Sequence, residues 1–187
     1  YRQKYPCVEF HIYVGDCSQF PQLLQQNLAD VAFSQHEEDH LPQMRRVFLF
    51  SWKSVFIVAP DHPLAHKKEL RFRDFDHQAL LLPVGEAGYP RTVRDLLKKH
   101  RIETRTVMES GSVEVIKQFI KCGLGISILP EIAVRSELES GVLVGLRSRD
   151  MDIPIRASML FHQDKWASPQ LAALEQIMAM AKVDGIK

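Results

Sequence analysis

Two serines, Ser110 and Ser112, flank a glycine at the expected start of a helix, where their hydroxyls could contact a ligand. The first N–H groups of a helix have no partner within the helix, so a helix start can hold an anion. One hydroxyl would cap the helix while the other contacts the ligand, and Gly111 would let the ligand approach the backbone closely. The alternative interpretation is plain helix capping, which needs only one serine and no ligand.

The residues around this turn predict the elements that position it. Residues 104–109 have the pattern of a strand that leads into the turn. Residues 113–122 then place apolar side chains at helical spacing, and Gly123 suits the left-handed position that ends a helix. A second strand is expected between this glycine and Pro130.

Strands and helices alternate along the rest of the chain, which predicts an α/β fold. The expected strands are residues 8–14, 29–34, 54–59, 79–82, 142–146 and 155–162, and the expected helices begin near Ser18, Tyr89, Pro130 and Ser168. Residues 8–14 alternate apolar and polar side chains, and with the next helix and strand they predict a βαβ unit with parallel strands. Residues 35–46 are polar and are expected to form a loop.

The start of the first helix has two candidate caps, Asp16 and Ser18. Pro21 favours Ser18, because proline is tolerated only in the first turn of a helix. An aspartate at this position would also repel an anion.

The bulk composition is that of an ordinary globular protein. The chain has 187 residues, of which 45% are hydrophobic and 25% charged, and its net charge of +1 lacks the basic excess of a nucleic-acid-binding surface. No apolar run approaches the roughly 20 residues that span a membrane. The three cysteines are too few for a disulfide framework, which favours the reducing cytoplasm.

The residue patterns predict neither an enzyme nor a metal or cofactor site. The sequence has no nucleophile elbow, Walker A loop or dinucleotide fingerprint. Residues 36–40 (HEEDH) offer metal-ligand side chains, although a solvated charged loop explains them more simply. Cys17, near a helix start, leaves a redox role open, whereas Cys122 on an apolar helix face is expected in the core.

The order of five short motifs resembles the effector-binding domain of LysR-type transcriptional regulators. The opening Tyr5-Pro6-x-Val8, followed by residues 28–33 (LADVAF), is similar to that family's "YPxV … GxLDLAI" pattern. The other motifs are residues 59–65 (APDHPLA), residues 123–130 (GLGISILP), residues 137–144 (ELESGVLV) and the pair Ser168-Pro169.

This resemblance implies two Rossmann-like lobes of the type 2 periplasmic-binding-protein fold, joined by two crossing strands, with a ligand cleft between them. Lobe I would hold residues 1–57 and 159–187, and lobe II residues 58–158. The first strand of the family's fold, its linker helix and its winged helix-turn-helix are absent upstream of Tyr1. The chain is therefore expected to be a fragment that lacks the DNA-binding domain.

The family positions that line the cleft map onto loops at the carboxyl ends of strands, where open α/β sheets bind ligands. In this sequence they are Gly15, Asp16, Ser34, Gln35, Val84, Gly85, Glu86, Ser110, Gly111 and Ser112.

The implied function is to sense a small metabolite or anion and so to control DNA binding by a full-length homodimer or homotetramer in the cytoplasm. One alternative is a solute-binding protein of a transporter, which an upstream signal peptide would support. An enzyme on the same fold is the other alternative, although the predicted cleft offers it no convincing acid–base pair or nucleophile. The sequence names neither the effector nor the target genes.

Overall fold

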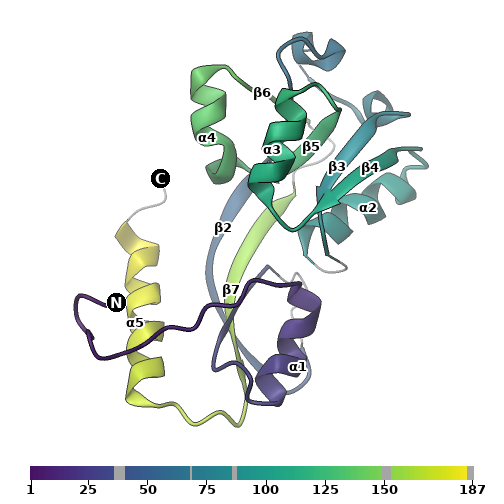
Figure 1. The fold of residues 1–187 in the computed structure, drawn as a ribbon. Helices are drawn as coiled ribbons and strands as arrows, with labels where there is room; N and C mark the ends of the chain where they lie inside the picture. The colour runs from purple at the N-terminus through teal and green to yellow at the C-terminus, as the bar shows by residue number, and fades with distance from the viewer. Residues whose placement is uncertain (36–40, 68, 86–87, 149–152, 185–187) are drawn as a thin grey trace. The chain divides into compact units, whose positions relative to one another are not determined.

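The computed structural model describes residues 1–35, 41–67, 69–85, 88–148 and 153–184, with side chains as far as residue 180. The chain forms two compact units (Figure 1). Unit 1 comprises Tyr1–Ser51 and Arg156–Lys187, and unit 2 comprises Trp52–Ile155. The chain passes from one unit to the other twice, within strands β2 (Met44–Val58) and β7 (Pro154–His162).

Unit 2 is built on a mixed sheet. Its strands are the second half of β2, β3 (Ala79–Pro83), β4 (Arg105–Ser110), β5 (Ile126–Pro130) and β6 (Val144–Leu146). Strand β3 lies between β4 and β5 and is parallel to both. Strand β2 pairs antiparallel with β5 on one side and with β6 on the other.

Helices cover both faces of this sheet, because successive residues of its strands point to opposite sides. Leu80 and Leu82 pack with residues of α2 (Tyr89–Lys99), whereas Leu81 packs with α3 (Val113–Lys121) and α4 (Glu131–Ser140). Two short 3₁₀ helices, Pro63–His66 and Phe72–Phe75, add Leu64 and Phe75 to the α2 side of the core. Unit 2 is therefore a three-layer α/β/α structure.

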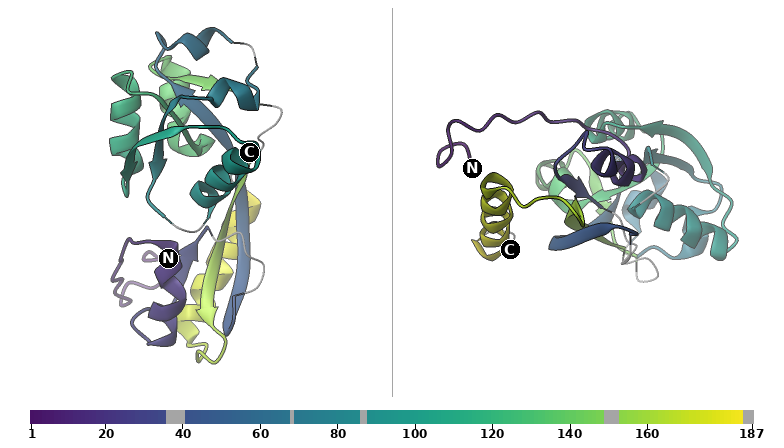
Figure 2. Two further views of the ribbon diagram at one scale, coloured as in Figure 1. Left: turned by 90° about the vertical axis from the view of Figure 1, so that its right-hand side faces the viewer. Right: turned by 90° about the horizontal axis from the view of Figure 1, so that it is seen from below.

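Unit 1 holds a smaller sheet with helices packed on it. Strand β1 (Ala32–Ser34) pairs antiparallel with β7, which lies between β1 and β2 in the strand order and runs beside β2 in Figures 1 and 2. A 3₁₀ turn (Cys17–Gln19) and α1 (Phe20–Gln25) place Leu24 against Ala32 and Leu160. Helix α5 (Pro169–Asp184) packs on the cluster formed by Leu49, Met159 and Phe161.

The expected strand at residues 8–14 is wrong, and so is the parallel βαβ unit built on it. These residues form no strand, and several of their apolar side chains are exposed: Phe10 by 43%, Ile12 by 84%, Tyr13 by 69% and Val14 by 82%. Alternation produces a strand only where a neighbour supplies hydrogen bonds, and no strand of the described residues pairs with this segment. The predictions for the helices starting at Tyr89, Pro130 and Ser168 and for strands β3, β4, β5 and β6 are confirmed.

Strand β2 begins at Met44, ten residues before the predicted start. The polar residues at its start hide the strand, because tertiary contacts neutralise them: Arg45 pairs with Glu175 at 2.8 Å and stacks 4.4 Å from the ring centre of Phe161. Cys122, expected in the core, is exposed at the C-cap of α3. Within the described residues, no helix combines the length and the apolar character needed to cross a membrane.

Candidate functional site

Two of the predicted ligand-contacting loops lie side by side in unit 2. Strands β3 and β4 are parallel neighbours with Pro83 opposite Ser110, so both loops leave the sheet at the same edge. The backbone N–H of Val84 donates to the carbonyl of Ser110 at 3.0 Å. The structure therefore brings Val84 and Gly85 next to the serine turn, at the carboxyl ends of the strands.

The serine turn shows how its hydroxyls are used. Ser112 caps α3, since its Oγ accepts a hydrogen bond from the N–H of Val115 at 3.4 Å. The Oγ of Ser110 accepts from the N–H of Ser112 at 3.1 Å. Each hydroxyl keeps its own proton to donate. A Cβ placed on Gly111 would meet nothing within 4 Å, so the space beside this backbone is open.

Arg94 of α2, which the sequence analysis did not single out, links the loop after β3 to the end of β4. Its Nη2 donates to the carbonyl of Gly85, and its Nη1 lies 3.2 Å from Oε1 of Glu109, the residue before the serine turn. The Arg94 side chain is 29% exposed. One signal was present in the sequence: Arg94 adjoins Val93, a buried position of the helix, and therefore borders its packed face.

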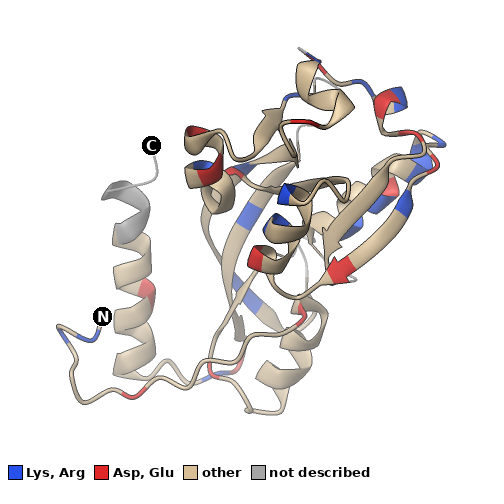
Figure 3. Cartoon of the chain, turned by 45° about the horizontal axis from the view of Figure 1, so that its top comes forward, with Lys and Arg blue, Asp and Glu red and all other residues tan. Residues whose placement is uncertain are grey.

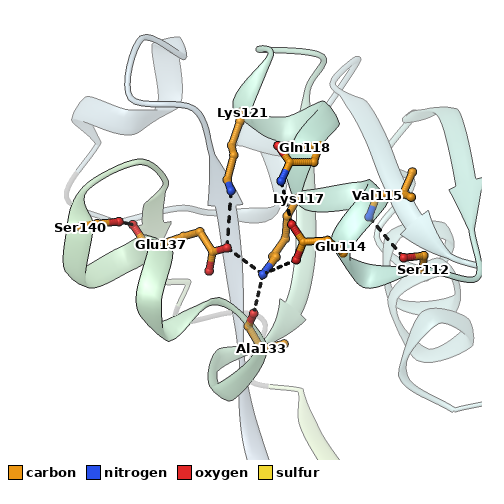
Figure 4. A network of polar contacts seen from close by, with 9 residues as sticks. All are labelled: Ser112, Glu114, Val115, Lys117, Gln118, Lys121, Ala133, Glu137 and Ser140. Carbon is orange, nitrogen blue, oxygen red and sulfur yellow. Dashed lines mark hydrogen bonds and ion pairs between the residues drawn. The ribbon is translucent and has the colours of Figure 1, made fainter.

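A network of ion pairs fixes the helix that starts at the serine turn (Figure 4). Lys117 of α3 lies 2.7 Å from a carboxylate oxygen of Glu137 on α4 and 2.8 Å from one of Glu114, and its ammonium also donates to the carbonyl of Ala133 at 3.3 Å. The Lys117 and Glu137 side chains are only 12% and 13% exposed. Lys121 approaches the same oxygen of Glu137 at 3.5 Å.

The ionisation of this network follows from its contacts. Hydrogen bonds to Glu114 and Glu137 raise the pKa of Lys117, and the hydrogen bond from Lys117 lowers the pKa of Glu137. Figure 3 shows basic and acidic residues together on α3 and α4. The network links α3 to α4 through Lys117, Lys121 and Glu137.

The predicted site residues of unit 1 lie in two places, at the end of β1 and at the start of the 3₁₀ turn before α1. Ser34 is 2% exposed and lies opposite Ser158, whose hydroxyl accepts from Nε of Arg46 at 3.1 Å. Asp16, not Ser18, caps the 3₁₀ turn: its carboxylate accepts from the N–H of Ser18 at 2.8 Å. Pro21 is accommodated because α1 begins one residue before it. Gly15 precedes Asp16 in the sequence, and the half-buried Gln35 follows Ser34. It stays a prediction that these residues of unit 1 bind the same ligand as the predicted site residues of unit 2.

Some predicted positions cannot be compared with the structure. Glu86 and the histidine-containing residues 36–40 lie outside the described residues. In the part of the chain that is described, no three His, Cys, Asp or Glu side chains are grouped as metal ligands. Two surface hollows of unit 1, one around Lys165 and Trp166 and one along residues 6–11, contain none of the predicted site residues.

A family model described as the LysR substrate binding domain matches residues 1–181. The chain belongs to this family. It is 29% identical over 92% of its length to the uncharacterized HTH-type transcriptional regulator YwqM of Bacillus subtilis, and 30% identical over 78% of its length to the HTH-type transcriptional activator CmpR of Synechocystis. It spans 59% of YwqM and 48% of CmpR.

Solved LysR regulatory domains share the fold. The regulatory domain of CcmR from Synechocystis, in complex with 2-PG, superposes with a TM-score of 0.86 at 24% identity, covering 98% of this chain and 88% of that one. The regulatory domain of MetR from N. meningitidis gives a TM-score of 0.78 at 26% identity, covering 99% and 85%. The predicted type 2 periplasmic-binding-protein-like fold and the LysR effector-binding family are therefore confirmed, and the transporter alternative is not supported.

Proposed function

We propose that this LysR-family chain is the sensing part of a longer regulator, in which a small effector changes how an N-terminal winged helix-turn-helix binds DNA in the cytoplasm. The family match over residues 1–181 carries this proposal. The matched relatives are transcriptional regulators, which also argues against an enzyme. The full-length protein would act as a homodimer or homotetramer, with effector binding shifting the population between its DNA-binding states.

We further propose that the effector contacts the serine turn and the loop after β3. Three features support this position: the loops meet at the carboxyl ends of parallel strands, the space beside Gly111 is open, and both serine hydroxyls retain a proton to donate.

A thermal-shift screen of metabolites and small anions, including 2-PG, tests the proposal on this chain, because a ligand that binds only the folded state raises the melting temperature. For each hit, calorimetry on S110A and S112A should show a loss of about 1 kcal/mol each, or roughly fivefold in affinity. The matched control is S140A, which removes a hydroxyl that bonds the carbonyl of Glu137 at the far end of α4.

Two results would count against the proposal. Unchanged effector affinity in S110A and S112A, together with a lower melting temperature, would reduce both serines to structural caps. Gel-shift assays with the full-length protein supply the other criterion: a hit that leaves DNA affinity and footprint unchanged is not an effector.

A further inference from the structure

Arg94 brings a positive charge to the edge of the sheet where the serine turn lies. Its guanidinium reaches from α2 to the carbonyl of Gly85 after β3 and to the carboxylate of Glu109 near the end of β4. These contacts place the cation beside the loop after β3 and the last residues of β4, on the face of the sheet that α2 covers. The backbone contact to Gly85 fixes the direction of the guanidinium without using its charge on another ion.

The ion pair between Arg94 and Glu109 is weak for an arginine–carboxylate contact. One nitrogen meets one oxygen at 3.2 Å, whereas strong charge-assisted hydrogen bonds measure about 2.7–2.9 Å and an arginine often binds a carboxylate through two parallel bonds. The Glu109 side chain is 43% exposed, so water also solvates its carboxylate. A ligand can displace such a contact at little cost.

We propose that Arg94 is the anion-recognising residue of this site, and that a carboxylate or phosphate of the effector replaces Glu109 on its guanidinium. The planar fork of donors in arginine matches the oxygens of both anion types. Glu109 then acts as an internal competitor for the same cation. This inference rests on the proposed function, because it assigns a ligand chemistry to the site beside the serine turn.

The proposal predicts that substituting Arg94 and substituting Glu109 change the affinity for an anion in opposite directions. R94M removes the cation and should weaken anion binding, whereas E109Q removes the competitor and should strengthen it. An ion pair with only a structural role predicts otherwise: breaking it from either side would destabilise the protein and change ligand binding in the same direction or not at all.

The experiment measures the affinity of this chain for inorganic phosphate by calorimetry at constant ionic strength. We expect R94M to bind at least about tenfold more weakly, as for a lost hydrogen bond to a charged group. E109Q should bind about two- to fivefold more tightly, the range of a partly exposed ion pair. R94K, which keeps the charge without the planar fork, should fall between wild type and R94M.

The matched control is R105M, which removes the same charge from the exposed start of β4, roughly 13 Å along the strand from Glu109. Its phosphate affinity should equal that of the wild type. The proposal is overturned if R94M and E109Q shift the affinity in the same direction, if R105M weakens binding as much as R94M, or if phosphate does not bind the wild-type chain. If R94M does not fold, R94K and E109Q still test the proposal, because R94K should weaken phosphate binding and E109Q should strengthen it.

Failure of this inference can be told apart from failure of the proposed function. The phosphate titration involves no DNA, whereas the gel-shift assay reads any effector that changes DNA binding, whatever its charge. A neutral effector that alters DNA binding without any phosphate affinity would overturn the role of Arg94 and leave the regulatory function standing. Phosphate binding with the expected signs, but no DNA response to any ligand, would support the role of Arg94 and overturn the regulatory function.

Discussion

The substitution of Lys117 by methionine tests whether the ion-pair network holds α3 in place. Methionine keeps much of the apolar stem but removes the ammonium that bonds Glu137, Glu114 and the carbonyl of Ala133. The Glu137 side chain, 13% exposed, would then keep only Lys121 at 3.5 Å as its neighbouring cation in the network.

The contacts set the size of the effect. Removing one partner of a fully buried ion pair costs about 3–5 kcal/mol. Because Lys121 remains near Glu137 and the site is not wholly buried, we expect K117M to lower the unfolding free energy by less, about 2 kcal/mol. For a chain of this size, that lowers the melting temperature by roughly 4–8 °C.

Thermal and urea unfolding measure the change, and its pH dependence tests the cause. Lys117 lowers the pKa of Glu137 from its ordinary 4.5, so this contribution is present above pH 4.5 and is lost as the pH falls through the lower, folded-state pKa. The difference between wild type and K117M should therefore be full at neutral pH and shrink in acid.

The matched control is E114Q, which changes the 59% exposed partner of the same ammonium and should have a much smaller effect. If K117M unfolds within about 0.5 kcal/mol of the wild type, the value typical of a plain surface substitution, the network does not hold α3. A difference that persists unchanged in acid would also refute the role of Glu137.

Two further predictions concern the backbone of unit 2 and one of its histidines. A Cβ on Gly125 would lie 2.2 Å from the carbonyl oxygen of Ala79, so G125A should cost about 2–3 kcal/mol in urea unfolding. G123A, where φ is +76° and a Cβ meets nothing, should cost about 1 kcal/mol, and equal losses in the two variants would contradict the steric argument. Burial lowers the pKa of His62 from 6.5, so its contribution to stability is present above pH 6.5 and is lost as the pH falls. H62N preserves the cap on the N–H of Leu64 and should flatten the stability profile between about pH 7.5 and 5.5; an equally steep profile would refute this assignment.

The elements of unit 2 could be predicted because their local signals agree with their packing. The double glycine after α3 illustrates this: Gly123 adopts the left-handed conformation that ends the helix, and the following strand is buried throughout. The apolar pattern, the caps and the turn residues all favour the same structure there.

The pattern was misleading where structure depends on distant partners. Residues 8–14 alternate like a strand yet pair with no strand of the described residues. The start of β2 looks like a loop in the sequence because Arg45 gains its partners, the carboxylate of Glu175 and the ring of Phe161, only on folding. In the candidate site, the position of the serine turn follows from its sequence. The role of Arg94 does not, because its contacts to Gly85 and Glu109 arise only from folding.

The chain enters unit 2 through β2 and leaves it through β7, and this order has a consequence for synthesis on the ribosome. Unit 2 is one continuous stretch, so all of it emerges before the second segment of unit 1 does. Ala32 in β1, by contrast, must wait for its partner Leu160, 128 residues later. At 5–20 residues per second, this strand edge stays unpaired for roughly 6–26 s, which makes unit 1 the part of the nascent chain most in need of protection from aggregation.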